Sequence, residues 1–148
     1  MPPRGASQFV SCFMDLVACA LDNRAPMSYQ LTIEQRPGYV HTKAVGERTP
    51  ENALRFLRDS YNACVNSGRT ALLLEMQLSG PPLSTTSIFD VISDRVADGL
   101  KLRKIAYVDG APQLEQAYFA ETVAMNRGVN VRLFLDVTAA ASWLAQDD

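Results

Sequence analysis

The stretch TALLLEMQLSGPPLSTTSIFDVISDRV, residues 70–96, decides the fold. Its residues 71–74 (ALLL) are apolar without alternation, which is typical of a strand covered on both faces in the middle of a parallel sheet. A loop rich in glycine and proline follows, and then Ile88, Val91 and Ile92 recur at helical spacing. This order of strand, loop and helix is how an open α/β sheet presents a site at the carboxyl end of a strand.

Strands and helices alternate through the rest of the chain. Residues 29–33 and 39–45 alternate between apolar and polar side chains around the turn signal RPG, which predicts a hairpin. Thr49 and Pro50 predict the start of a helix that ends at Gly68. The later segments predict strands at residues 105–108 and 131–135, each followed by a helix. The predicted fold is therefore α/β, a single layered domain of order β-β-α-β-α-β-α-β-α, with a mixed sheet of a hairpin and then parallel strands.

The first 27 residues differ in composition from the remainder of the chain. Phe9, Phe13 and Leu16 fall at helical spacing, which indicates a short amphipathic helix in an N-terminal extension. Three interpretations stay open for this segment: an accessory extension, a helix that docks on the domain or on a partner, and a targeting signal. We expect the domain itself to span residues 28–148.

Composition excludes several classes of protein. The 148 residues are 47% hydrophobic and 20% charged with a net charge of −2, which is typical of a globular domain and gives no reason to expect a nucleic-acid partner. Cys12, Cys19 and Cys64 have no ligand-like spacing, so we expect reduced thiols, a cytoplasmic location and no metal site. No apolar run approaches the roughly 18 residues that a membrane span needs.

Hydroxyl groups gather after the predicted central strand. The backbone N–H groups of a helix N-terminus can bind an anion, so Ser79, Gly80, Ser84 and Ser87 are the candidate loop for an anion or a partner. The alternative is that these hydroxyls only cap the helix.

Three segments resemble the SpoIIAA-like STAS/SEC14 group of small bacterial proteins, the fold of the anti-sigma-factor antagonists. They are GERTPENALRFL (46–57), KIAYVDG (104–110) and VRLFLDVTAAASWL (131–144), and the resemblance covers residues 27–144. It implies a non-catalytic regulatory module that docks a partner protein, an anti-sigma factor or a kinase, through the loop and helix after the third strand. The family's phosphorylated Asp-Ser-Ser-Gly motif falls on residues 84–87, so the resemblance makes Thr86 the phosphoacceptor candidate and Thr85 the adjacent one.

A second hypothesis is a carrier of a small apolar ligand or lipid. It requires a cavity between sheet and helices, and the candidate lining residues are Phe89, Tyr107, Tyr118 and Phe119.

Catalysis has little support in the sequence. No nucleophile elbow, phosphate-binding loop, dinucleotide motif or zinc motif is present, and no cofactor is expected. His41 has no assignable partner, so acid–base chemistry would fall to Glu75 or Asp109 at strand ends. The hairpin or the N-terminal segment could also pair across a two-fold axis in a homodimer.

Overall fold

The computed structural model describes residues 29–109 and 114–146. The predicted extension of residues 1–27 lies outside the described residues, so both it and the domain boundary remain predictions. Among the helices of the described residues, none combines the length and the apolar character that a membrane span requires.

A mixed sheet of five strands forms the centre of the fold. In spatial order its strands are β2 (Gln30–Arg36), β3 (Tyr39–Glu47), β4 (Ala71–Ser79), β5 (Lys104–Val108) and β6 (Val131–Phe134). β2 and β3 pair in antiparallel orientation, and the remaining pairs are parallel. The predicted hairpin, the parallel strands and the α/β order are thus confirmed.

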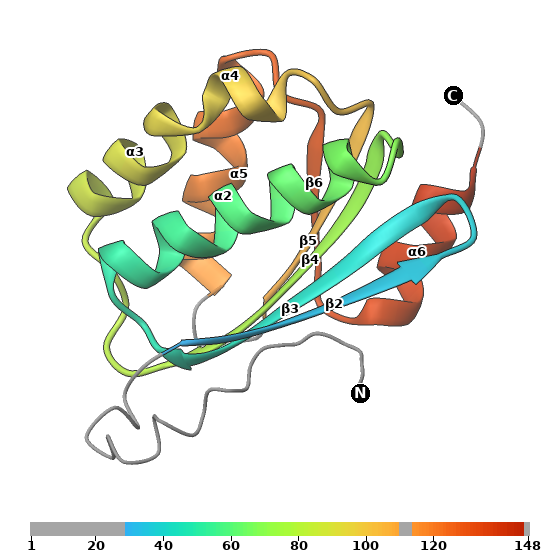
Figure 1. Cartoon of the computed structure of the whole chain (residues 1–148). Coiled ribbons are helices and arrows are strands. Elements are labelled where there is room, and N and C mark those ends of the chain that lie inside the picture. The colour runs from blue at the N-terminus through green and yellow to red at the C-terminus, as the bar shows by residue number, and fades with distance from the viewer. Residues whose placement is uncertain (1–28, 110–113, 147–148) are drawn as a thin grey trace.

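Helices cover both faces of the sheet (Figure 1). One face carries α2 (Pro50–Asn66), α3 (Thr85–Asp94), the short α4 (Val96–Gly99) and α5 (Leu114–Asn126), and the other carries α6 (Val137–Ala145). The first helix begins as predicted, because the Thr49 side chain accepts the backbone N–H of Asn52 and Pro50 is the first helical residue.

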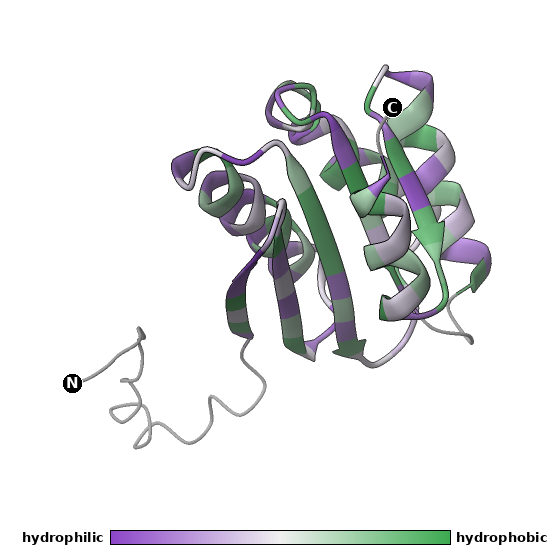
Figure 2. Ribbon diagram, turned by 90° about the vertical axis from the view of Figure 1, so that its right-hand side faces the viewer, coloured by the Kyte–Doolittle hydropathy of each residue, from purple (hydrophilic) through white to green (hydrophobic). Residues whose placement is uncertain are grey.

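Side chains of the central strand fill two separate cores. Leu72 and Leu74 belong to the larger core beneath α2, α3 and α5, together with the fully buried Phe56. Leu73 lies in the smaller core beneath α6, where it packs with Ala140. The central strands accordingly carry long hydrophobic stretches in Figure 2. This two-sided burial is why residues 71–74 lack the alternation of a half-exposed strand.

A buried lysine ties the last helix to the sheet. Lys104 is 2% exposed, and its Nζ donates to the carbonyl oxygens of Trp143 (2.9 Å) and Gln146 (2.7 Å). These carbonyls belong to the C-terminal end of α6, where the helix dipole favours a positive charge. The ammonium also lies 4.9 Å from the centroid of the Trp143 ring.

Candidate functional site

Arg48 binds the loop that follows the central strand β4 through several hydrogen bonds. The backbone N–H of Arg48 donates to Ser79 O (2.7 Å), and its guanidinium donates to Leu78 O (2.5 Å) and to Gly80 O. Gly80 has φ = +119°, a backbone conformation that favours glycine. Arg48 therefore fixes the point where the chain leaves β4. In the sequence, Arg48 is marked only as part of the segment GERTPENALRFL (46–57) and not as a residue of the loop after β4.

The next helix begins within the predicted window. Ser84 is the N-cap of α3, its Oγ accepts the Ser87 N–H (3.1 Å), and its hydroxyl donates to Ser87 Oγ (3.1 Å). Thr85 and Thr86 form the first turn and are exposed. The four hydroxyls thus divide into a capping pair and a solvent-facing pair.

The residues of the candidate anion loop do not all line the same cleft. Ser79 and Gly80 line an open polar cleft of about 750 Å³ at the carboxyl edge of the sheet, whereas Ser84 and Ser87 are not among its lining residues. The charged lining residues of this cleft are Arg48, Glu75, Asp109 and Asp136. Because carboxylates outnumber guanidinium groups there, the described part of the cleft does not favour an anion.

An exposed aromatic side chain lies beside the solvent-facing threonines. Phe89 is 42% exposed one turn after Thr85, and the Arg127 guanidinium stacks over its ring at 4.7 Å from the centroid. Asp90 is also exposed. We call the set of Thr85, Thr86, Phe89 and Asp90 the α3 surface. It combines hydroxyl, aromatic and acidic groups on one helix.

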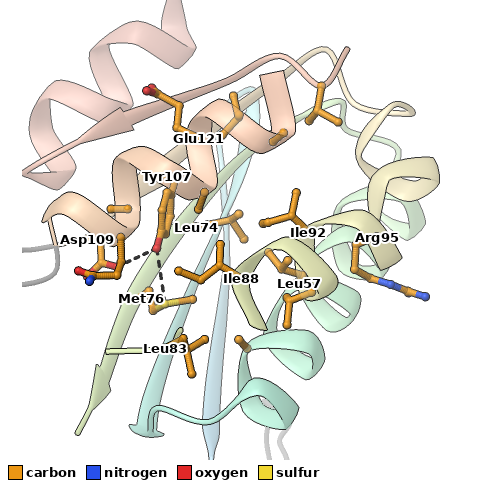
Figure 3. Close-up of a pocket in the computed structure, with 18 of the residues that line it drawn as sticks. Leu57, Leu74, Met76, Leu83, Ile88, Ile92, Arg95, Tyr107, Asp109 and Glu121 are labelled. Carbon is orange, nitrogen blue, oxygen red and sulfur yellow. Dashed lines mark hydrogen bonds between the residues drawn. The ribbon is translucent and has the colours of Figure 1, made fainter. Parts of the chain in front are cut away.

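A partly enclosed apolar cavity lies behind α3, between the sheet, α2 and α5 (Figure 3). Its volume is about 90 Å³. The apolar residues that line it are Ala53, Leu57, Leu74, Met76, Leu83, Ile88, Val91, Ile92, Val96, Ala117, Ala120, Ala124, Val129 and Val131. The same α3 helix that presents the α3 surface to solvent thus turns Ile88, Val91 and Ile92 inward.

Tyr107 is the aromatic residue that reaches this cavity from β5 (Figure 3). Its hydroxyl donates to Asp109 Oδ2 at 2.7 Å and lies 3.7 Å from Met76 Sδ. Burial, reinforced by the Asp109 carboxylate, raises the pKa of Tyr107 well above its ordinary value. The hydroxyl therefore stays protonated and acts as a donor.

The other three residues expected to line a cavity lie elsewhere. Phe89 and Tyr118 are exposed, at 42% and 54%, and Phe119 is half-buried. None of the three is among the cavity's lining residues, because Phe89 belongs to the outer side of α3 and the inward side of α5 carries alanines.

His41 has a partner that the sequence did not reveal. Its Nε2 lies 2.8 Å from Glu75 Oε1, across the β3–β4 pair, and Gln77 Nε2 donates to Glu75 Oε2 (2.7 Å). Both oxygens of this carboxylate are therefore engaged. Within the described residues, no group of three or more His, Cys, Asp or Glu side chains is placed to hold a metal ion.

Comparisons with known proteins support the fold. No protein-family model and no curated protein matches the chain. Among solved structures, the chain is similar to an anti-sigma factor antagonist from Mycobacterium paratuberculosis, with a TM-score of 0.57 and 16% sequence identity. The match covers 82% of this chain and 98% of that chain. Together with the mixed five-stranded sheet, it shows that this chain has the STAS-like fold.

Proposed function

We propose that this protein is a non-catalytic regulatory module that docks a partner protein through the α3 surface and the loop before it. The observation that carries the proposal is the fold match over nearly the whole of an anti-sigma factor antagonist. Fold alone does not fix function, so the surface must supply the rest of the argument.

The α3 surface has a composition suited to docking. Phe89 offers an aromatic anchor, a residue type enriched at interfaces. Thr85 and Thr86 add exposed hydroxyl groups beside it. The partner that fits the fold is a protein of the anti-sigma-factor or kinase type.

Phosphorylation of Thr86, or of Thr85, would regulate this docking. A phosphate adds a charge of about −1.5 to −2 at pH 7. The first turn of α3 contains no acidic residue, and a helix N-terminus favours negative charge, so the modified protein stays folded. The added charge would change the electrostatic match with the partner, and repulsion from the exposed Asp90 one turn later would extend the phosphate into solvent.

The test is affinity capture from a bacterial extract with three forms of the full chain. Wild type should retain a specific partner, and Thr86→Glu should lose it. Thr138→Glu is the matched control, because Thr138 is also an exposed second residue of a helix, α6, on the opposite face of the sheet. This control should retain the partner as wild type does.

Two results would contradict the proposal. Equal capture by the Thr86→Glu and Thr138→Glu variants would place any docking surface elsewhere, and the absence of a specific partner under all conditions would remove the docking function. Peptide mapping of the protein after incubation with extract and ATP adds a separate check, since stoichiometric phosphate outside Thr85 and Thr86 would contradict the regulatory step.

The carrier hypothesis is the weaker candidate. Ligand pockets usually start at about 300 Å³, whereas the apolar cavity measures about 90 Å³. A whole lipid does not fit this volume.

The cytoplasmic location and the homodimer remain predictions from the sequence.

A further inference from the structure

We propose that the apolar cavity behind α3 is a binding site for a small uncharged apolar molecule, or for the end of an aliphatic chain. This site is separate from the α3 surface, since it lies on the inner side of the helix. It does not depend on the proposed docking function.

The cavity exists because α5 presents small side chains to the sheet. Ala117, Ala120 and Ala124 lie at helical spacing, and all three line the cavity. Opposite them are Leu74 from β4 and Ile88 from α3. The larger side chains around the cavity set the distance between α5 and the sheet. At that distance the methyl groups of the three alanines are too short to fill the space that faces them.

The polar groups that line the cavity determine which kind of ligand it can bind. Most of these groups already form hydrogen bonds within the protein. Tyr107 donates to Asp109, and Arg48 donates to carbonyl oxygens of the loop after β4. Arg95 is engaged with Asp94 and Asp98, and in Figure 3 its guanidinium points away from the cavity.

Glu121 is likewise occupied, because its Oε2 accepts the backbone N–H of Leu133 at 2.7 Å. The remaining polar lining residues are Tyr61 and Gln116. A polar ligand would lose its water-bonded groups and gain few partners in return, which costs free energy. An apolar ligand gives up no hydrogen bonds with water when it enters.

The volume limits the size of the occupant. An apolar cavity of about 150 Å³ in another protein stays dry and takes up benzene or xenon. At about 90 Å³ this cavity is smaller, so xenon or a short aliphatic group fits it better than an aromatic ring does.

The first experiment records methyl NMR spectra of the full chain under xenon pressure. Methyl signals of Leu74, Ile88 and Ile92 should shift saturably. Signals of Leu73 and Leu144, in the core beneath α6, should not shift. Equal shifts in both sets, or no saturable shift at the cavity methyls, would overturn the proposal.

A second measurement titrates primary alcohols from propanol to octanol. Burial of each additional methylene should tighten binding about fourfold while the cavity still accepts it, as expected from about 0.8 kcal/mol per methylene. A plateau by about butanol would identify a free small molecule as the natural class of ligand, whereas a continued rise would identify a longer chain whose end enters the cavity. Affinity that does not depend on chain length from the start would overturn the proposal.

Variants then locate the site. Ala120→Leu adds three carbon atoms inside the cavity and should abolish the xenon shifts, whereas Ala139→Leu makes the same change on the exposed side of α6 and should leave them intact. If Ala120→Leu fails to fold, Leu83→Phe fills the cavity from the loop before α3, where the side chain is only half-buried. Retention of the xenon shifts in a folded cavity-filling variant would refute the assignment.

Discussion

Replacing Tyr107 by Phe removes one hydroxyl from the wall of the apolar cavity. That hydroxyl donates to Asp109 at 2.7 Å, and Asp109 is only 7% exposed. A hydrogen bond to a charged group contributes about 1.5–3 kcal/mol to the free energy of unfolding. When a buried carboxylate loses such a donor, water does not fully replace the lost hydrogen bond. We therefore expect Tyr107→Phe to lower the free energy of unfolding by about 2 kcal/mol.

Urea denaturation followed by circular dichroism measures this change. For a domain of this size a slope of about 2 kcal/mol per molar urea is reasonable, so the midpoint should fall by about 1 M. Tyr118→Phe is the matched control, because it removes the same atom from a side chain that is 54% exposed, and its effect should stay within about 0.5 kcal/mol. Equal midpoints for the two variants would refute the argument that this hydrogen bond stabilises the fold.

The raised pKa of Tyr107 gives the same prediction a pH dependence. A phenol whose pKa is higher in the folded state keeps its full stabilising effect below the ordinary value of about 10 and loses it as the pH rises above that value. The difference between wild type and Tyr107→Phe should therefore be constant from pH 6 to pH 9. It should shrink only in strong alkali.

Three further predictions concern the α3 cap, the α6 anchor and the buried thiol. Ser84→Ala should destabilise the protein by about 1 kcal/mol in urea denaturation and Ser84→Gly by only a few tenths, because the lost cap leaves the Ser87 N–H unpaired. Lys104→Met should cost about 2 kcal/mol by the same assay, and hydrogen exchange should quicken in α6, whose last carbonyls lose their donor. Burial raises the pKa of the Cys64 thiol to about 11, so in a background lacking the other two cysteines it should react with a disulfide reagent at pH 8 far more slowly when folded than in denaturant; equal rates would show that the thiol is accessible.

The fold could be predicted because its signals are local. A run of four apolar residues, a Thr-Pro helix start and a turn around Gly38, which has φ = +87°, each act within a few residues. Which residues of a helix are buried depends on tertiary packing, and the sequence predicts this less well. Val65 falls at helical spacing with Leu57 and Tyr61, which predicts a buried position, yet it is 45% exposed. Phe56, in contrast, is fully buried. The buried side of α2 runs through Phe56, Ser60 and Cys64 into the last turn, and Val65, the next residue, lies outside it.

Asp90, Asp94 and Asp98 recur at intervals of four residues, which predicts an acidic ridge along one helix, but the structure divides this segment between two helices. The spacing assumed one continuous helix, but α3 ends at Asp94 and α4 begins at Val96. Arg95 lies at the break and pairs with both Asp94 and Asp98. Helical periodicity cannot report a break of this kind, because the residues on each side still have helical spacing.

The pairing of His41 with Glu75 was beyond any sequence pattern because it depends on register. In the parallel β3–β4 pair, Lys43 lies opposite Glu75 and His41 lies opposite Leu73, so the imidazole reaches a carboxylate two positions along the neighbouring strand. A shift by one residue would place His41 and Glu75 on opposite faces. The contact therefore follows from the strand alignment, which brings together two residues that are 34 positions apart in the sequence.

The cavity also depends on tertiary packing, in this case on where small and large side chains face one another. The carrier hypothesis places large aromatic residues around the ligand, but large side chains fill space, and Phe89 and Tyr118 are exposed to solvent instead. Space arises where small residues face a rigid wall, as Ala117 and Ala120 do across from the sheet. Alanines at helical spacing on a sheet-facing helix are also typical of close packing, so the sequence alone cannot distinguish a void from a tight contact. The distinction depends on α3, whose Ile88 and Ile92 set the width of the gap while its outer side forms the α3 surface. The cavity and the α3 surface therefore lie on opposite sides of the same helix.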